Sequence, residues 1–453
     1  MSERRILACL TLVALVASLA SCSNSNSSSS SGSSASGSTE TGSTASGEEV
    51  ILTLPTYYCG ENVGAVYFEP AVERFNEKYD GQYEVQLEEV VEASYNDKMS
   101  TLAQSGKLPV LISGGSTEWI NTVLIPQKLY YDTKDWLNES GIIDLCLDSS
   151  VEYSTQEDGS VVGVPIVTVS TTGLYYNGAN YTPDKNICDM SMDEFIASLD
   201  GQNMAWQTVD NAWTSMLFLT ALVANEEGGA EWLQEYDGTK CYDYNTEWMV
   251  SAVTKLLDVW NQTGGSTYVG KAYADAANDF MSGNSAVICN GTWMNSEFSE
   301  SGSANWSNGF DGANVHADYY PGNIALCNTK AYGRWFLTNN YSSDAELEAA
   351  KAFLEFIYSP EELETFALTE GCQIPNLEYS DDFVASLDEN PLVKEQNEKL
   401  TDDTLMVPTI ASIMPDSVAN SVLANALTQL VNGAITPEEF CNTLTVKAEE
   451  SKA

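Results

Sequence analysis

Positively charged residues are scarce in this sequence. Its 453 residues include 19 lysines and arginines against 65 aspartates and glutamates, which gives a formal net charge of −46. Proteins that bind nucleic acid neutralise its phosphates with Lys and Arg, so this balance argues against a nucleic-acid partner. It also argues against direct binding to anionic lipid. We interpret the excess of acidic residues as a solvated, soluble exterior.

Residues that could hold a metal ion or a cofactor are also few. The only histidine is His316, and no two cysteines have the C-x-x-C spacing of a zinc or iron–sulfur site. Residues 265–272 (GSTYVGKA) approach a phosphate-binding loop, but Ala272 stands where that loop needs a Ser or Thr hydroxyl. We therefore predict no cofactor and no metal.

Eight cysteines follow the N-terminal segment, and the sequence alone leaves their state open. They are Cys59, Cys146, Cys188, Cys241, Cys289, Cys327, Cys372 and Cys441. An even number in an exported chain is compatible with disulfides. Several lie inside apolar runs, where a free thiol is a small core residue.

Motifs for catalysis are missing as well. There is no G-x-S-x-G, no H-E-x-x-H and no EF-hand loop, and a Ser–His triad could use only His316. The many acidic residues leave a glycoside hydrolase open as an alternative, although no pair of carboxylates is singled out. We predict that the protein is not an enzyme.

The N-terminus predicts export. Arg4 and Arg5 precede an almost wholly apolar stretch, residues 6–20, which is too short to span a bilayer and reads as a secretory signal over residues 1–21. Thirteen of residues 23–47 are serine, so residues 22–47 are predicted to be a disordered tether. No later segment is apolar enough for a transmembrane helix.

Strand and helix patterns alternate after the tether. Residues 50–54 predict a buried strand, 68–79 a helix, 85–87 a strand, 95–103 a helix and 110–112 a strand. This order predicts a parallel sheet covered by helices, and ligands bind such sheets beyond the carboxyl ends of the strands. Further on, residues 276–281 predict a helix, 286–289 a buried strand and 295–314 a long surface loop.

Aromatic residues are the informative class. Their faces stack on sugar rings, while Asn, Gln, Asp and Glu bind the hydroxyls. Trp232, Trp248 and Trp260 fall at helical positions and are assigned to packing. In contrast, tryptophans at positions 119, 206, 293 and 335 lie in turns beside strand ends. Trp293 follows the buried strand and the turn Asn290-Gly291, where packing does not account for it.

Four stretches in order resemble the extracellular solute-binding proteins of ABC sugar importers, the group that includes maltose-binding protein. They are LAQSGKLPVLIS, DGSVVGVPIVTVSTTGLYYN, AANDFMSGNSAVICNGTW and AAKAFLEFIYSPEELETFALTEGCQIP. The N-terminal Leu19-Ala20-Ser21-Cys22 similarly resembles a bacterial lipobox, which implies cleavage before Cys22 and its acylation. The anchor would hold the protein at the cell membrane, facing the extracellular side or the periplasm.

The resemblance implies an α/β, two-lobed periplasmic-binding-protein-like fold with a hinge and an interlobe cleft. Lobe I would be residues 48–168 plus 318–366, and lobe II residues 169–317 plus 367–453. The crossings between lobes are expected near 167–170, 317–321 and 364–371.

The resemblance also implies ligand-binding residues, with Trp293 at the family's G-x-W tryptophan. The complete set is Tyr57, Tyr58, Glu118, Trp119, Trp206, Trp293, Tyr332, Gly333 and Trp335. The acidic sugar ligands of maltose-binding relatives are not clearly reproduced, because Ser116 and Val169 stand near their places.

The function implied is a substrate-binding lipoprotein that captures a mono- or oligosaccharide and delivers it to the permease subunits of an ABC transporter. Its aromatic content favours an oligosaccharide, and a monomer is expected, attached to the membrane only by its lipid. One alternative is a receptor for a non-sugar solute such as a polyamine. The other is a surface glycoside hydrolase.

Overall fold

The computed structural model of the protein describes residues 49–60, 62, 64–235, 240–299, 307, 309, 311–401 and 403–452. Residues 48–453 form one compact unit. The predicted signal (1–21) and tether (22–47), with the lipidation candidate Cys22, lie outside the described residues.

Nine strands are present among the described residues. They are β1 (Val50–Thr56), β2 (Tyr83–Glu89), β3 (Leu111–Ser113), β4 (Thr172–Asn177), β5 (Val287–Gly291), β6 (Val315–Asp318), β7 (Ile324–Leu326), β8 (Trp335–Leu337) and β9 (Leu405–Val407). β1 pairs with β2, and β3 pairs with β8. The remaining strands form one sheet in the order β5-β4-β7-β9, in which β6 also pairs with β4.

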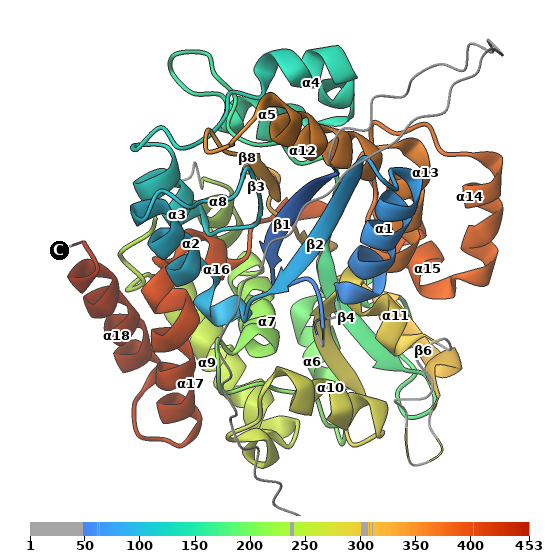
Figure 1. Cartoon of the computed structure of the whole chain (residues 1–453). Helices are drawn as coiled ribbons and strands as arrows, with labels where there is room; N and C mark the ends of the chain where they lie inside the picture. The colour runs from blue at the N-terminus through green and yellow to red at the C-terminus, as the bar shows by residue number, and fades with distance from the viewer. Residues whose placement is uncertain are drawn as a thin grey trace, which may run out of the picture. The chain divides into compact units, whose positions relative to one another are not determined.

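Helices surround these strands (Figure 1). In the first part of the chain they are α1 (Ala65–Lys78), α2 (Tyr95–Gln104), α3 (Thr117–Trp119), α4 (Lys134–Ser140), α5 (Asp148–Ser154), α6 (Met192–Ser198), α7 (Trp213–Ala224), α8 (Gly229–Gln234) and α9 (Glu247–Gln262). In the second part they are α10 (Tyr273–Met281), α11 (Asn295–Phe298), α12 (Asp344–Ile357), α13 (Pro360–Glu370), α14 (Asp381–Ser386), α15 (Pro391–Lys399), α16 (Ile410–Ile413), α17 (Leu423–Val431) and α18 (Pro437–Glu450).

The first strands and helices are those that the hydrophobic periodicity predicts. β1 and β2 are parallel, with Leu52 opposite Val85, and α1 packs beside β2 (Figure 1). One boundary differs, because α1 begins at Ala65 and Pro70 lies inside it. The earlier start adds Ala65 and Tyr67, both buried, to the side of the helix that faces the core.

The third strand departs from the prediction of a simple parallel sheet. β3 lies against β1, but its ladder is antiparallel with β8, where Ser113 is opposite Trp335. Strand pairing over such a sequence separation depends on tertiary packing, which local periodicity does not report. The chain therefore brings residues 334 and 335 to the end of β3.

Two principal groups of buried side chains divide the core. One contains residues from 52–167 and 335–383, and the other contains residues from 174–326 and 392–448. The chain passes between these groups at 167–174, 326–335 and 383–392. Val169, in the first of these passages, exchanges two backbone hydrogen bonds (2.7 and 3.1 Å) with Gln373. The sequence-based limits of the two lobes stay a prediction.

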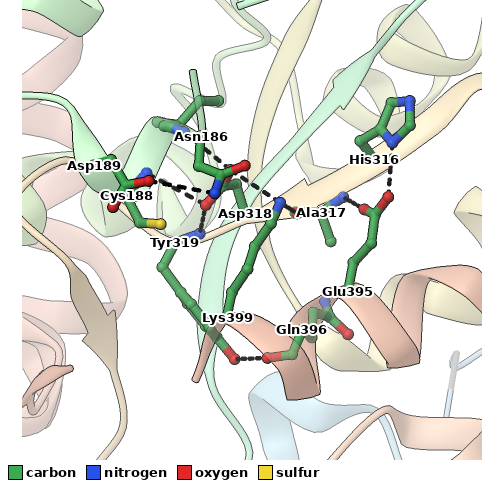
Figure 2. A network of polar contacts seen from close by, with 11 residues as sticks. Asn186, Cys188, Asp189, His316, Ala317, Asp318, Tyr319, Glu395, Gln396 and Lys399 are labelled. Carbon is green, nitrogen blue, oxygen red and sulfur yellow. Dashed lines mark hydrogen bonds and ion pairs between the residues drawn. The ribbon is translucent and has the colours of Figure 1, made fainter. Parts of the chain in front are cut away.

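A buried carboxylate joins β6 to α15. Asp318 has a fully buried side chain that accepts hydrogen bonds from the backbone N–H groups of Ile187 (3.0 Å), Cys188 (3.3 Å) and Tyr319 (2.8 Å). Its Oδ2 also lies 3.0 Å from Nζ of Lys399 at the end of α15 (Figure 2). Buried charges are tolerated when they are paired and hydrogen-bonded in this way.

The single histidine reinforces the same junction. His316 Nδ1 lies 2.8 Å from Oε1 of Glu395 on α15, and Glu395 Oε2 accepts the N–H of Ala317 at 2.8 Å (Figure 2). The imidazole stacks on Tyr176, with ring centroids 5.1 Å apart. His316 therefore has a structural partner, and its bonds hold α15 against the sheet.

Candidate ligand-binding site

Trp293 lies in a 3-10 turn (Thr292–Met294) directly after β5. Its indole is half-buried and rests on the backbone of Gly291, where a Cβ atom would overlap the six-membered ring. Trp293 Nε1 donates to the Tyr273 hydroxyl (3.2 Å), which donates to Oδ1 of Asn290 (3.0 Å). This relay holds the indole plane in one orientation.

A second indole lies beside the first. Trp213, also half-buried, has its ring centroid 6.3 Å from that of Trp293, at an interplanar angle of 42°. It opens α7 after Ala212, which has a left-handed backbone (φ 52°). Non-glycine residues adopt this conformation at a cost and are concentrated at functional sites.

The loop that leads to Trp213 is organised by a buried amide. Gln207 donates from Nε2 to the carbonyl of Val209 (3.1 Å) and to Oδ1 of Asn211 (3.3 Å), and its Oε1 accepts the N–H of Thr214 (3.1 Å). These bonds offset the strain at Ala212. Trp213 and Trp293 therefore form a preorganised pair of aromatic surfaces.

The loop after β1 carries a second cluster of aromatic and charged side chains. Tyr57 and Tyr58 share a hydrogen bond between their hydroxyls (2.9 Å), and their rings lie 4.2 Å apart. The guanidinium of Arg334, which directly precedes β8, stacks on Tyr58 with Cζ 3.4 Å from the ring centroid. All three side chains are half-buried.

Two contacts bring the Tyr57–Tyr58–Arg334 cluster close to the indole pair. At the end of α13, Gly371 packs so closely on Asn295 and Thr292 that a Cβ atom would overlap the Asn295 amide. Its neighbour Glu370 lies within electrostatic range of Arg334. The two parts of the core therefore meet where both clusters lie.

Four ionisable groups at this meeting point, two carboxyls and two phenols, favour their neutral forms. Burial raises the pKa of Glu370 to about 7, although Arg334 opposes the shift. Burial also raises the pKa of Glu92. Burial raises the pKa of both Tyr57 and Tyr273, and the charge of Glu92 adds to each shift. The hydrogen bonds of Tyr273 with Trp293 and Asn290 oppose its shift. Because Glu92 acts on both phenols, it lies within electrostatic range of each cluster.

Three of the predicted tryptophans pack in the core. Trp206 is 0% exposed and donates from Nε1 to Oγ1 of Thr263 (3.1 Å). Trp119 is 4% exposed and donates to Oγ of Ser100 (3.0 Å), and Trp335 is 3% exposed. Packing accounts for all three indoles, and none offers a ring face to a ligand in this conformation.

The other predicted residues have individual positions. Glu118 is exposed, and its Oε2 accepts the backbone N–H of Asp416 (3.0 Å), which joins the two parts of the core. Tyr332 donates to Oδ1 of Asn121 (2.9 Å) and packs on Tyr153. Gly333 permits a close backbone approach, because a Cβ atom there would overlap the carbonyl oxygen of Val164.

From the predicted set, the structure joins Tyr57 to Tyr58 in one cluster and places Trp293 in the indole pair. It adds residues that sequence reasoning did not select, namely Glu92, Trp213, Tyr273, Arg334 and Glu370. The sequence does distinguish Arg334, because arginine occurs after the N-terminal segment only at positions 74 and 334. The alternation of β8 also points to it, because Trp335 faces the core and its neighbour must face the other way.

Other kinds of site are not found within the described residues. No group of three His, Cys, Asp or Glu side chains there could hold a metal, and no helix there is long and apolar enough to cross a membrane. The eight cysteines are free thiols. A surface pocket of about 420 Å³ between α4 and α12 is lined by Ser140, Glu355 and Asn376, among others, and includes none of the aromatic residues described above.

Comparison with known proteins identifies the class. Residues 70–395 match the sequence profile of a family described as bacterial extracellular solute-binding protein. This match covers more than half of the chain, and the protein belongs to that family. No curated protein sequence matches the chain.

Solved structures of low sequence identity share the fold. A chitin oligosaccharide binding protein has a TM-score of 0.67 and 18% identity, covering 89% of this chain and 99% of its own. A Streptococcus pneumoniae solute-binding protein in complex with the blood group A-trisaccharide has a TM-score of 0.66 and 20% identity, covering 88% and 100%. Maltose-bound MalE3 of T. maritima has a TM-score of 0.64 and 16% identity, covering 88% and 99%. The chain has the two-lobed α/β fold of solute-binding proteins, which confirms the predicted fold class and family.

Proposed function

We propose that this protein is the substrate-binding lipoprotein of an ABC transporter, which captures an extracellular saccharide and delivers it to the permease. The observation that carries the proposal is the indole pair formed by Trp213 and Trp293. Both rings are half-buried, and Trp293 is fixed by Gly291 and by the relay through Tyr273. Aromatic planes of this kind stack on the apolar faces of sugar rings.

Polar groups beside the indoles suit sugar hydroxyls. The Asn290 side chain is buried, and its Nδ2 has no hydrogen-bond acceptor among the described residues. Buried polar atoms without a partner are rare, and a ligand hydroxyl would supply one here once opening of the lobes exposes this enclosed atom. Two structural relatives, a chitin oligosaccharide binding protein and a solute-binding protein in complex with a trisaccharide, support the choice of a sugar over another solute.

The mechanism proposed is closure of two lobes around the ligand, with no covalent step. The ligand would be held between the indole pair and the Tyr57–Tyr58–Arg334 cluster, which come from different parts of the core. Closure would strengthen every polar contact by removing water. The hydrogen bond between Glu118 and the Asp416 backbone would form in the closed state.

The remaining parts of the proposal concern the cellular setting. We propose that residues 1–21 are a signal peptide, that Cys22 carries the lipid, and that residues 22–47 hold a monomeric binding unit away from the membrane. Lobe I would comprise 48–168 plus 318–366 and lobe II 169–317 plus 367–453. Mass spectrometry of membrane-extracted protein tests the anchor, which requires an acylated Cys22 at the mature N-terminus.

A panel of saccharides and polyamines tests the central proposal. A saccharide present at a hundredfold excess over its Kd should stabilise the protein by about 2.7 kcal/mol and raise its melting temperature. Chromatography should recover that saccharide unchanged. Stabilisation by a polyamine alone would contradict the sugar receptor, and released hydrolysis products would contradict a purely binding role.

A further inference from the structure

The two arginines after the N-terminal segment differ in their partners. Arg74 is paired with Glu362 through Nε and Nη2, each at 2.7 Å from a carboxylate oxygen. Arg334 has no carboxylate within ion-pair distance among the residues that the structure describes. In a chain with 65 acidic residues this is an unusual environment for a cation.

The stacking of Arg334 on Tyr58 determines which of its N–H groups can bind a ligand. One face of the guanidinium covers the Tyr58 ring, with Cζ 3.4 Å from the centroid. Tyr58 is in turn held by its hydroxyl bond to Tyr57. A stacked guanidinium keeps its N–H groups in the plane parallel to the ring, so they point sideways as a rigid fork. A fork of this geometry binds both oxygens of a carboxylate.

The acidic residue nearest Arg334 neutralises it only in part. Glu370 is the carboxyl group whose charge acts on Arg334. Burial raises the pKa of Glu370 to about 7, so a large fraction of this carboxyl group is uncharged at neutral pH. A half-buried cation without a counter-charge is costly, and an anion that arrives with the ligand removes this cost. A polyamine would meet repulsion from the same guanidinium.

The overall charge of −46 does not prevent an anion from binding here. Salt at physiological strength screens exposed charges beyond roughly 8 Å. Arg334 would act at hydrogen-bond distance, where this screening is weak. The overall charge therefore affects the approach of an anionic ligand more than its final contacts.

We propose that the ligand is an acidic saccharide whose carboxylate is bound by the guanidinium of Arg334 while its sugar rings stack on Trp213 and Trp293. This inference rests on the proposed function and narrows its substrate class. It makes Arg334 a specificity-determining residue, because a neutral sugar would leave the fork without its anionic partner.

Calorimetric titration of the full-length protein with matched saccharide pairs tests this inference. The pairs are trigalacturonate and its methyl ester, 3′-sialyllactose and lactose, and glucuronate-substituted and plain xylotriose. We expect the acidic member of at least one pair to bind about tenfold more tightly, or better, than its neutral partner. If neutral members bind as tightly in every pair, the inference is wrong and the proposed function stands. If no saccharide in the panel binds, both the inference and the proposed function are wrong.

Variants locate the preference within the molecule. Arg334→Gln should weaken the binding of the acidic saccharide about tenfold or more and change the affinity for the neutral saccharide by about twofold at most. Arg334→Lys should retain part of the preference, because it keeps the charge and loses the fork. Lys185→Gln removes the same charge from an exposed position and should leave both affinities unchanged. Equal weakening of both ligands by Arg334→Gln, at an unchanged melting temperature, would overturn the charge-based role.

Discussion

Trp293 and Trp206 show how the environment decides what a tryptophan does. Trp206 is enclosed by Phe218 and Trp260, and its N–H is bonded to Thr263. Trp293 packs on a glycine on one side and has exposed ring surface on another. The first side chain contributes to stability, and the second is available to a ligand.

Replacing these two residues should therefore have opposite effects. Trp293→Ala should weaken saccharide binding by about 2 kcal/mol, or roughly thirtyfold, through the lost ring contact. Trp206→Ala should lower the free energy of unfolding by about 3–5 kcal/mol, because it creates a cavity in the core. Calorimetry and urea unfolding measure the two quantities. Trp248→Phe, in α9, is the control and should leave affinity unchanged. A large loss of stability in Trp293→Ala would place that indole in the core.

Glu370 should make stability depend on pH. Its folded pKa is about 7, above the unfolded value of roughly 4.3, so the unfolded chain ionises first as pH rises. Stability is therefore lost between about pH 4.3 and 7, by roughly 1–3 kcal/mol for a partly exposed group. The Glu370→Gln variant should lack this component. Urea unfolding at pH 5 and pH 8 checks it, with the exposed Glu361→Gln on the same helix as control. Parallel changes in wild type and Glu370→Gln would contradict the shift.

At the residue level, the sequence predicts which positions lie in turns but not how each side chain is oriented. Trp335 was expected beside the ligand. The pairing of β8 with β3 instead buries the Trp335 side chain in the core, and the side chain of Arg334 lies on Tyr58. One residue of register reverses this result. Trp213 was missed because nothing in the local sequence predicts the left-handed conformation of Ala212.

At the level of elements, hydrophobic periodicity predicts most of the structure. The helix α10 lies where its apolar pattern indicates. The strand β5 extends further than predicted, because Asn290 and Gly291, expected to form a turn, pair with Gly173 and Thr172 of β4. A capping box between Thr436 and Glu439 opens α18. The segment 295–314, expected to be a loop, begins instead with the short helix α11, because Phe298 packs in the core and orders that turn. Part of this segment lies outside the described residues.

Two elements related by tertiary contact show what periodicity cannot predict. The side chain of Glu118 accepts a hydrogen bond from the backbone N–H of Asp416. A π-helical turn follows shortly after each of these two residues, at Ile120–Leu124 and at Val418–Val422. Such turns are often found at functional sites. Their position near a contact between the two parts of the core agrees with a role in closure.

The bond between β6 and α15 should respond to pH. A hydrogen bond with Glu395 raises the pKa of His316, so the pair contributes stability fully below about pH 6.5 and loses it as pH rises through the folded pKa. Although burial opposes its ionisation, the His316 and Ala317 hydrogen bonds lower the pKa of Glu395, so the contribution also fades under acid conditions. His316→Gln should therefore cost more stability at pH 6 than at pH 8.5, as measured by urea unfolding. An equal loss at both pH values would argue against an ionic contribution.

At the level of the whole molecule, four sequence motifs predict the family and fold that the comparison establishes over residues 70–395. The identity of the ligand was not predictable in the same way. It depends on side chains that approach one another only after folding, such as Tyr58 with Arg334 and Trp213 with Trp293. These residues are separated by long stretches of sequence, so no local pattern joins them.

The most direct test of the account is a titration followed through the indole N–H resonances of ¹⁵N-labelled protein. Adding a stabilising saccharide should shift the resonances of Trp213 and Trp293, which can be assigned with single Trp→Phe variants. The resonances of the buried Trp206 and Trp260 should move much less. Large shifts confined to other indoles, or no shift under saturating ligand, would contradict a saccharide site at Trp213 and Trp293.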